Sequence, residues 1–357
     1  MFFVGVWFGI SNHTLLGAIP RLSYQLFTAR MHYYRLLAFF LLWAVLLSIT
    51  ACNVKLPMML SSLSSAPKTV ANAKPVPPFQ TETFVDSSAV RLLVVGDWGT
   101  GASLQKRIAE QMCAKAGKEK PMFILSTGDN IYNSGVASVD DPQWKTKFED
   151  IYSCAELMLP WYVVLGNHDH RGSFQAQIDY HQKNPRWNMP DRYYRFGTMA
   201  KDGTTLDIIA IDTDPLNRKD TAFTRKQNTW LRGELSVSKA RWKIVVGHHM
   251  IRSHGGYGDQ DYMIENIKPL LDEFTVDLYV NGHDHDLQYL KAPEDRFYCL
   301  ISGGGGSGRD TGYGTNTIFA ATNGGFHYIA VTQSRLYIEF LDSEGKTTFA
   351  TNIRKAQ

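Results

Sequence analysis

The sequence lacks an excess of either charge. It contains 37 Lys and Arg against 34 Asp and Glu, a net charge of +3, and no block of basic residues. Proteins that bind nucleic acid usually concentrate Lys and Arg in one block or on one surface, so we expect no nucleic-acid partner. The length of 357 residues and a hydrophobic fraction of 44% are instead typical of a globular protein with one large domain or two ordinary ones.

A hydrophobic run of full membrane-spanning length is also lacking near the N-terminus. The apolar stretch from Leu36 to Ala51 has 16 residues, which is short for a spanning helix but has the length of a signal-peptide core. It follows a short basic start at Met31–Arg35 and ends in Leu47–Cys52. Small residues before a cysteine resemble a bacterial lipobox, which predicts cleavage before Cys52 and a lipid on its sulfur. The alternatives are an ordinary signal peptide with a chance cysteine and an uncleaved anchor.

These features predict three regions along the chain. Met31 is the natural start of the targeting signal, so residues 1–30 would be an upstream extension of the reading frame. We predict a targeting segment at 1–52, a disordered linker at 53–88 that is rich in Ser, Pro, Ala and Lys, and one folded domain at 89–357. The expected location is that of an exported lipoprotein anchored to a membrane, in the periplasm or at the cell surface, with secretion as the alternative.

Cysteine is scarce in the predicted domain. Only Cys113, Cys154 and Cys299 remain after Cys52, and none has the spacing of a zinc ligand. An odd number cannot all pair internally. Export allows one disulfide but does not require it.

From Val90 onward, predicted strands and helices alternate, and the last four predicted strands are antiparallel. This order predicts an α/β fold, specifically a four-layer αββα sandwich with two sheets between outer helices. The predicted strands are 90–95, 122–126, 161–165, 206–211, 243–246, 278–280, 297–302, 325–332, 335–341 and 347–352, and the predicted helices are 103–115, 141–152, 175–181, 224–235 and 259–274.

Five of the predicted strands are followed by a glycine and then by Asp, Asn or His. The strings are Gly96-Asp97, Gly128-Asp129, Gly166-Asn167-His168-Asp169, Gly247-His248-His249 and Gly282-His283-Asp284-His285. The carboxyl ends of strands are the usual place for ligands in open α/β sheets, and a glycine lets the backbone turn sharply before the ligand. The repeated pattern predicts a metal site built on a rigid sheet.

The candidate metal ligands share oxygen or imidazole donors; they are Asp97, Asp129, Tyr132, Asn167, His248, His283 and His285. Seven ligands of mixed type exceed one four-coordinate zinc site and suit two ions, which a carboxylate can bridge. Taken singly, each string has a plainer interpretation as a turn, a helix cap or a satisfied histidine pair. Their occurrence together and in order favours the metal site.

These strings resemble the five motifs of the calcineurin-like metallophosphoesterases, and Tyr132 is similar to the tyrosine of the purple acid phosphatases. The connecting segments, among them Leu159–Tyr162, Tyr193-Tyr194 and Asp286–Tyr289, resemble the small tartrate-resistant type. The resemblance covers about residues 90–352 and implies the αββα metallophosphoesterase sandwich.

The resemblance also implies a binuclear Fe(III)–M(II) centre in which M is iron or zinc. Asp97, Tyr132 and His285 would hold the ferric ion, Asn167, His248 and His283 the divalent ion, and Asp129 would bridge them. The neighbouring His249 is the alternative to His248. The implied activity is that of an acid phosphatase, which hydrolyses phosphate monoesters of small molecules or phosphoproteins by attack of a metal-bound hydroxide.

Two further histidines are implied as catalytic groups. His168 would stabilise the phosphate or donate a proton, with Asp169 orienting its ring. His254 resembles the family's second active-site histidine, although the loop before it is shorter and the adjacent Glu is missing, so a plain loop histidine is the alternative. The segment after Asp212 is shorter than the loop that covers the site in the animal enzymes, which predicts activity as an intact chain.

Several other functions remain open from the sequence. The same metal frame could serve a phosphodiesterase or nucleotidase, or an iron redox protein, although the presence of His168 favours hydrolysis. A lipid-anchored binding protein with a dead site is disfavoured because all seven ligands are present. The Gly303–Gly306 run lacks the Lys-Ser/Thr of a P-loop and is predicted to form a mobile active-site rim, with a simple chain reversal as the alternative.

Overall fold

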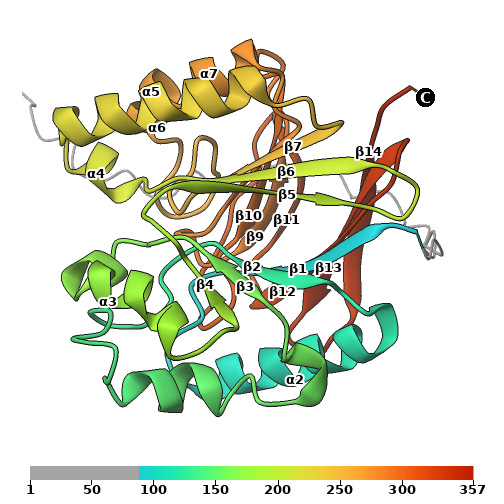
Figure 1. Ribbon diagram of the computed structural model, residues 1–357. Coiled ribbons are helices and arrows are strands. Elements are labelled where there is room, and N and C mark those ends of the chain that lie inside the picture. Colours follow the sequence, from blue (N-terminus) through green and yellow to red (C-terminus); the bar gives the residue numbers. More distant parts are fainter. Residues whose placement is uncertain (1–87, 357) are drawn as a thin grey trace, which may run out of the picture. The chain divides into compact units, whose positions relative to one another are not determined.

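The computed structural model describes residues 88–356, all of which belong to one compact unit of the chain. Two seven-stranded sheets pack face to face in this unit, and helices cover the outer face of each (Figure 1). The predicted four-layer αββα sandwich is therefore confirmed. The predicted targeting segment and all but the last residue of the predicted linker lie outside the described residues.

The first sheet has the strand order β14-β13-β12-β1-β2-β3-β4. Strands β1 to β4 run parallel, and the three C-terminal strands continue the sheet as an antiparallel meander from β1. The strand bounds are β1 Val90–Val95, β2 Phe123–Ser126, β3 Trp161–Val163, β4 Trp187–Asn188, β12 Gly325–Val331, β13 Arg335–Asp342 and β14 Thr347–Arg354.

The second sheet has the order β11-β9-β10-β8-β7-β6-β5. Its centre, from β6 through β7 and β8 to β10, is parallel, while the strands at its two edges pair antiparallel. The strand bounds are β5 Tyr194–Met199, β6 Thr205–Ala210, β7 Trp242–Val246, β8 Leu278–Asn281, β9 Leu287–Leu290, β10 Tyr298–Ser302 and β11 Thr317–Ala321.

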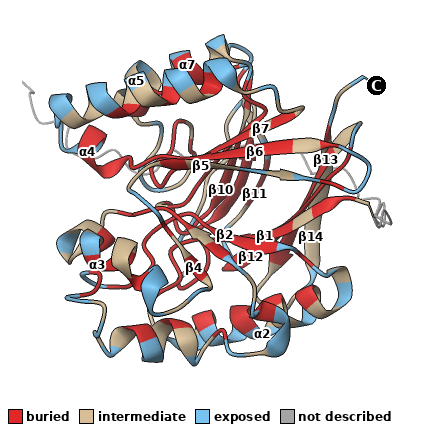
Figure 2. Cartoon of the chain, in the orientation of Figure 1, coloured by how far each residue is buried: buried red, intermediate tan, exposed pale blue. Residues whose placement is uncertain are grey.

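Helices α2 (Ser103–Glu119) and α3 (Phe174–Asp179) lie beside the first sheet. The outer face of the second sheet is covered by α4 Asp214–Asn217, α5 Thr221–Val237, α6 Asp261–Asn266 and α7 Lys268–Glu273. Buried residues gather between the sheets and on the inward sides of these helices (Figure 2).

The second sheet buries both of its faces, and the alternation of side chains along a strand explains how. In β7, Ile244 and Val246 belong to the core between the two sheets, whereas Val245 belongs to the core under α5 to α7. In β8, Val280 faces the first core and Tyr279 the second. The near-continuous apolar runs that predicted these strands are therefore those of a sheet covered on both sides.

Two predicted helices differ in the structure. The predicted helix at 141–152 is reduced to one wide π-type turn at Lys145–Glu149. The predicted helix at 259–274 is divided into α6 and α7, because Pro269 has no N–H to donate to the preceding turn and its ring crowds that turn. Strands β4, β5, β9 and β11 were not predicted: β4, β5 and β11 lie at the edges of the sheets, and β9 is short, at Leu287–Leu290.

One disulfide joins Cys113 of α2 to Cys154, with their Cα atoms 6.4 Å apart. Cys299 is free and is buried in the core beneath α5 to α7. Of the three cysteines in the domain, two therefore form a disulfide and the third is an apolar core residue.

Candidate metal centre

The seven candidate ligands converge at the carboxyl ends of the parallel strands. Asp97 follows β1, Asp129 follows β2 and Asn167 follows β3, all in the first sheet. His248 follows β7 and His283 follows β8 in the second sheet, so the site spans the edge where the two sheets meet. This is the position that strand-end residues in a parallel sheet predict.

One half of the cluster gathers around the Tyr132 hydroxyl. Its oxygen lies 3.0 Å from Asp97 Oδ1, 2.9 Å from Asp129 Oδ2 and 3.1 Å from His285 Nε2. His285 Nε2 also lies 3.3 Å from Asp97 Oδ1. We call these residues the tyrosine half: Asp97, Tyr132 and His285, with Asp129 shared.

The other half gathers around the His248 imidazole. His248 Nε2 lies 3.2 Å from Asn167 Oδ1 and 3.1 Å from His283 Nδ1. The same nitrogen is 3.6 Å from Asp129 Oδ2. We call Asn167, His248 and His283 the histidine half. Asp129 contacts both halves, which is the position of a bridging ligand.

The candidate ligands suit cations because several of their acceptor atoms lie within contact distance of one another with too few hydrogens to pair them. His248 Nδ1 lies 2.9 Å from the Thr127 carbonyl oxygen, which can only accept, so Nδ1 carries the proton. In the neutral ring, His248 Nε2 therefore directs a lone pair at the amide oxygen of Asn167. Tyr132 has one hydroxyl hydrogen for the two carboxylate oxygens of Asp97 and Asp129. A cation in each half would satisfy these atoms.

The side-chain charges in the cluster also favour bound cations. Burial raises the pKa of Tyr132 well above its ordinary value, and the charges of Asp97 and Asp129 raise it further. Burial opposes the charging of His248, but Asp129 and Asp97 outweigh it and raise the His248 pKa. Burial and the neighbouring His248 lower the pKa of His283 to about 3. The carboxylates that would attract cations thus also favour the protonated forms of Tyr132 and His248.

Three candidate ligands adopt the left-handed backbone region that non-glycine residues rarely occupy. Their φ angles are 56° at Asp97, 50° at Asp129 and 70° at His283. Within residues 88–356, they are half of the six non-glycine residues with positive φ. Such conformations cost free energy and persist where surrounding structure fixes them, which is common at functional sites.

The glycines that precede the ligands were predicted to let the backbone turn, but most of them do not have the backbone conformation that requires glycine. Of the five, only Gly128 has a positive φ, 94°. A Cβ at Gly166 would collide with the Asp129 carboxylate, and one at Gly282 would collide with Asp97. The prediction that glycine supplies the turn is therefore wrong at most of these positions. At Asp97, Asp129 and His283 the ligand residue itself adopts the positive φ, and Gly166 and Gly282 leave room for the carboxylates of Asp129 and Asp97.

His168 lies beside both Tyr132 and Asp129. Its ring centroid is 4.4 Å from that of Tyr132, its backbone N–H donates to Asp129 Oδ1 at 2.8 Å, and its Nε2 lies 3.9 Å from Asp129 Oδ2. Its Nδ1 lies 2.6 Å from the Asn133 carbonyl oxygen. Because a carbonyl only accepts, Nδ1 carries a proton and Nε2 is the atom available to a substrate.

The expectation that Asp169 orients the His168 ring is not met. The buried carboxylate of Asp169 accepts hydrogen bonds from the backbone N–H groups of Asn130, Ile131 and Gly166 at 2.8–3.2 Å. These amides belong to the loops that carry Asp129 and Asn167. Asp169 therefore fixes two ligand-bearing loops against each other, because backbone donors outcompete a side chain that the Asn133 carbonyl already holds.

His254 and His249 both have partners outside the cluster. His254 Nε2 contacts Asn316 Oδ1, and its backbone N–H donates to Gln288 Oε1 at 2.9 Å. A proton-donor role for His254 therefore stays a prediction, and no contact with a candidate ligand supports it. His249 Nδ1 lies 2.7 Å from Thr213 Oγ1, so the geometry favours His248 as the ligand.

Some residues at the cluster were missed by sequence reasoning. Ser307 Oγ contacts His285 Nδ1, and the backbone N–H of Arg309 donates to the His285 carbonyl at 2.8 Å. Both follow the Gly303–Gly306 run, which packs on the loop of Asp97: the N–H of Gly305 donates to the Gly96 carbonyl at 2.9 Å. The predicted active-site rim at Gly303–Gly306 was the only sequence feature that could have indicated Ser307 and Arg309.

Two cavities adjoin the cluster, one at each half. A cavity of about 320 Å³ is lined by Tyr132, His168 and His285, together with Lys147 and Arg309. A cavity of about 430 Å³ is lined by Asn167 and His283, together with Arg171, Arg218 and Tyr257. Both therefore combine candidate ligands with cationic side chains, as a site for a phosphate ester requires.

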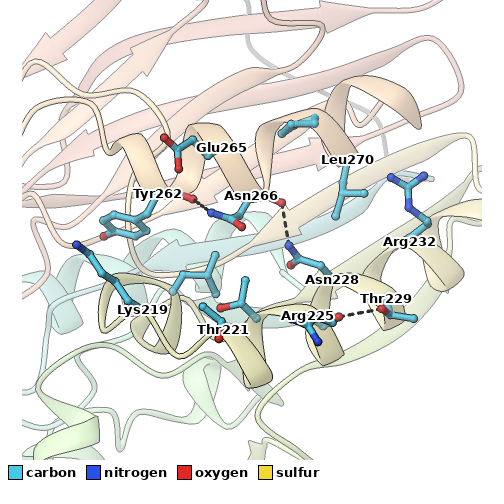
Figure 3. Close-up of a pocket in the computed structure, with 13 residues that line it drawn as sticks. Lys219, Thr221, Arg225, Asn228, Thr229, Arg232, Tyr262, Glu265, Asn266 and Leu270 are labelled. Carbon is cyan, nitrogen blue, oxygen red and sulfur yellow. Dashed lines mark hydrogen bonds between the residues drawn. The ribbon is translucent and has the colours of Figure 1, made fainter.

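A cavity larger than these two lies elsewhere. It measures about 760 Å³ and opens between α5 and α6–α7, where Lys219, Arg225 and Arg232 surround it (Figure 3). None of the seven candidate ligands lines it. Its size therefore does not mark it as the reaction site.

Comparisons with known proteins agree with this geometry. Residues 90–287 match the model of the Metallophos family, the calcineurin-like phosphoesterases. Purple acid phosphatase 4 of Arabidopsis thaliana is 35% identical over 308 residues, 80% of this chain and 88% of the relative. Tartrate-resistant acid phosphatase type 5 of Oryctolagus cuniculus is 32% identical over 74% of this chain and 91% of the relative. A solved structure of GAP50, described as the anchor in the inner membrane complex of Plasmodium, aligns with a TM-score of 0.70 at 27% identity, covering 76% of this chain and 90% of that one.

The fold and the cluster are thus those of a calcineurin-like metallophosphoesterase. Within that class, the chain belongs to the family of the purple acid phosphatases and the tartrate-resistant acid phosphatases type 5. Membership implies a binuclear metal centre, and the two halves that share Asp129 fit one.

Proposed function

We propose that this protein is a binuclear-metal acid phosphatase that hydrolyses phosphate monoesters. The observation that carries the proposal is the arrangement of seven donors in two halves around the shared Asp129, with the Tyr132 hydroxyl in one half only. The names of the relatives, which are acid phosphatases, support the same activity. Phosphorylated small molecules and phosphoproteins are the proposed substrates.

The proposed metal assignment follows from the ligands of each half. Asp97, Tyr132 and His285 would hold Fe(III), and Asn167, His248 and His283 would hold Fe(II) or Zn(II). Because burial and two carboxylates oppose ionisation of Tyr132, a strongly polarising trivalent ion is best suited to displace its proton. When bound, the two ions would activate a water molecule and offset charge on the phosphate.

In the reaction, the oxygen of water forms a new bond to phosphorus, the ester P–O bond breaks, and a proton reaches the leaving oxygen. His168 is placed to hydrogen-bond the phosphate or supply that proton through Nε2, because the Asn133 carbonyl fixes its Nδ1–H. Lys147 and Arg309 line the same cavity and would attract the dianionic phosphate.

We further propose that the protein is exported and held at a membrane by a lipid on Cys52, in the periplasm or at the cell surface. The disulfide between Cys113 and Cys154 supports an oxidising compartment, where such bonds persist. Between residues 88 and 356, no helix has both the length and the apolarity needed to cross a membrane.

Fractionation tests this localisation. Cys52→Ala should move the protein from the membrane fraction to the soluble fraction, and the membrane-bound form should resist extraction by salt but not by detergent. Ser61→Ala serves as the matched control. A wild-type protein that is already soluble would contradict the lipid anchor and favour simple secretion.

One experiment tests the proposed activity and the centre together. The purified protein should contain two metal ions per chain, at least one of them iron, and should hydrolyse phenyl phosphate with an acidic optimum. Its visible absorption should contain a charge-transfer band that depends on Tyr132. A metal-loaded protein that releases no inorganic phosphate from any monoester, or that cleaves only diesters, would overturn the proposal.

A further inference from the structure

An aromatic side chain is exposed directly beside the histidine half. The Tyr257 ring stacks on the His283 ring, with centroids 4.3 Å apart and planes 26° apart. Tyr257 nevertheless remains 48% exposed. Among the large hydrophobic side chains that are exposed between residues 88 and 356, it is the only aromatic one. An exposed aromatic residue on a candidate metal ligand is an unusual use of apolar surface.

The loop around Tyr257 is fixed at several points. The backbone N–H of Tyr257 donates to Asp284 Oδ1 at 3.2 Å, and its carbonyl accepts from Gln260 Nε2 at 2.9 Å. At the start of the loop, the Ser253 N–H donates to Asp259 Oδ1 at 2.9 Å. Asp284 lies next to His283 in the chain, so the loop is tied to the same strand end that carries the candidate ligand. The ring is therefore held in place before any substrate arrives.

A cavity adjoins both Tyr257 and the histidine half. The cavity of about 430 Å³ is lined by Asn167, His283 and Tyr257, with Arg171 and Asn217 also lining it. The Arg309 guanidinium lies 5.2 Å from the centroid of the Tyr257 ring. Arg171 forms no ion pair with a carboxylate of the described residues, so its charge is available to an anionic ester.

We propose that Tyr257 is a specificity-determining residue that selects phosphate esters whose leaving group contains a flat aromatic ring. With its phosphate at the cluster and His168 hydrogen-bonded to a phosphate oxygen, an ester would extend its leaving group into this cavity, where an aromatic ring can pack on the exposed part of Tyr257. A small aliphatic leaving group gains much less from such a surface. This inference rests on the proposed phosphatase activity. Aryl phosphates and nucleoside phosphates share the required chemistry.

The test compares three substrates in three proteins. Wild type, Tyr257→Leu and Tyr257→Phe are assayed with phenyl phosphate, adenosine 5′-monophosphate and glycerol 2-phosphate. Tyr257→Leu should raise KM for the aromatic esters by about threefold to tenfold, the effect of one aromatic stacking contact, with kcat little changed. KM for glycerol 2-phosphate should not change, and Tyr257→Phe should keep the selectivity of the wild type.

The pattern across substrates identifies the source of the ring. An effect on phenyl phosphate alone assigns the platform to aryl esters, an effect on the nucleotide alone assigns it to nucleosides, and either supports the inference. Equal changes for all three esters, or none, would overturn it while leaving the phosphatase activity intact. Failure of the wild type to hydrolyse any of them would instead refute the proposed function.

Because Tyr257 packs on His283, metal content is measured for every variant. A second readout avoids turnover: calorimetric titration of the metal-loaded proteins with phenylphosphonate and with methylphosphonate. Tyr257→Leu should weaken phenylphosphonate binding only. If that variant loses metal, Tyr257→Trp decides the question, because a larger ring should lower KM for the aromatic esters. Unchanged selectivity in Tyr257→Trp would then overturn the inference.

Discussion

The two halves of the cluster differ in charge although they share Asp129. The tyrosine half contributes a carboxylate, a phenol and one imidazole, whereas the histidine half contributes an amide oxygen and two imidazoles. With the phenol ionised, the first half carries two negative charges of its own and the second carries none. Hard, highly charged cations favour anionic oxygen ligands, and divalent ions such as zinc accept imidazole. The asymmetry of the ligands therefore predicts an asymmetry of the ions.

The substitution with the largest expected effect removes the residue that both halves share. Asp129→Ala should lower the content of both metals and reduce kcat/KM by at least about 10³-fold, because each half loses a ligand and the charge that joins them. Metal analysis and phosphate release measure the two effects. Asp140→Ala, at an exposed carboxylate, is the control. Full activity in Asp129→Ala would contradict the bridge.

A change confined to the tyrosine half should alter the colour. Tyr132→Phe should abolish the visible charge-transfer band and reduce kcat by about 10²-fold, since the ring remains but the phenolate oxygen is gone. Tyr313→Phe removes a hydroxyl that donates to the Ala320 carbonyl, outside the cluster, and should leave the spectrum unchanged. A band that persists in Tyr132→Phe would show that the ligand assignment of this half is wrong.

A change confined to the histidine half should leave the colour intact. Asn167→Ala should weaken binding of the divalent ion by about 10- to 100-fold, while the visible band remains. Equilibrium dialysis against zinc, with the spectrum recorded in parallel, separates the two halves. Asn217→Ala, which lines the same cavity, is the matched control. Loss of the band in Asn167→Ala would mean that the halves are not separate sites.

The smallest expected effect on the metals comes from a residue that contacts Tyr132 and the shared Asp129 without being a ligand. His168→Ala should keep both metals and the visible band but lower kcat by about 10²-fold, the usual contribution of a positioned acid or hydrogen-bond donor. His181→Ala, at an exposed histidine, should change neither. Loss of metal in His168→Ala would reassign His168 as a ligand or as a support for Asp129.

The sequence was most informative where backbone periodicity and ligand chemistry coincide. An apolar run followed by Gly-Asp or Gly-His determines both a strand and the edge at which it ends, so the meeting of Asp97, Asp129 and His248 could be predicted. The partners of Asp169 could not. Two of them, the backbone amides of Asn130 and Ile131, are 39 and 38 residues away in sequence, and their positions depend on how two strands pack rather than on residue type.

The same dependence on tertiary packing explains why the short strands could not be predicted from the sequence. Strand β11 and the Ser307 contact follow a glycine-rich segment with no period of its own, and their positions are set by packing against β9 and the Asp97 loop. The pairing of Cys113 with Cys154 likewise depends on where α2 lies beside the chain before β3. Tertiary contacts determine these features, and no local pattern encodes them.

The cluster draws its ligands from both sheets. Asp97, Asp129 and Asn167 follow strands of the first sheet, while His248, His283 and His285 follow strands of the second. Ions bound there would have ligands from both sheets and would therefore connect the two sheets at one edge. Metal would then act as a stabiliser of the sandwich as well as a reagent, so the melting temperature should rise with metal concentration by mass action. The edge that performs the chemistry would also be the edge that holds the sheets together.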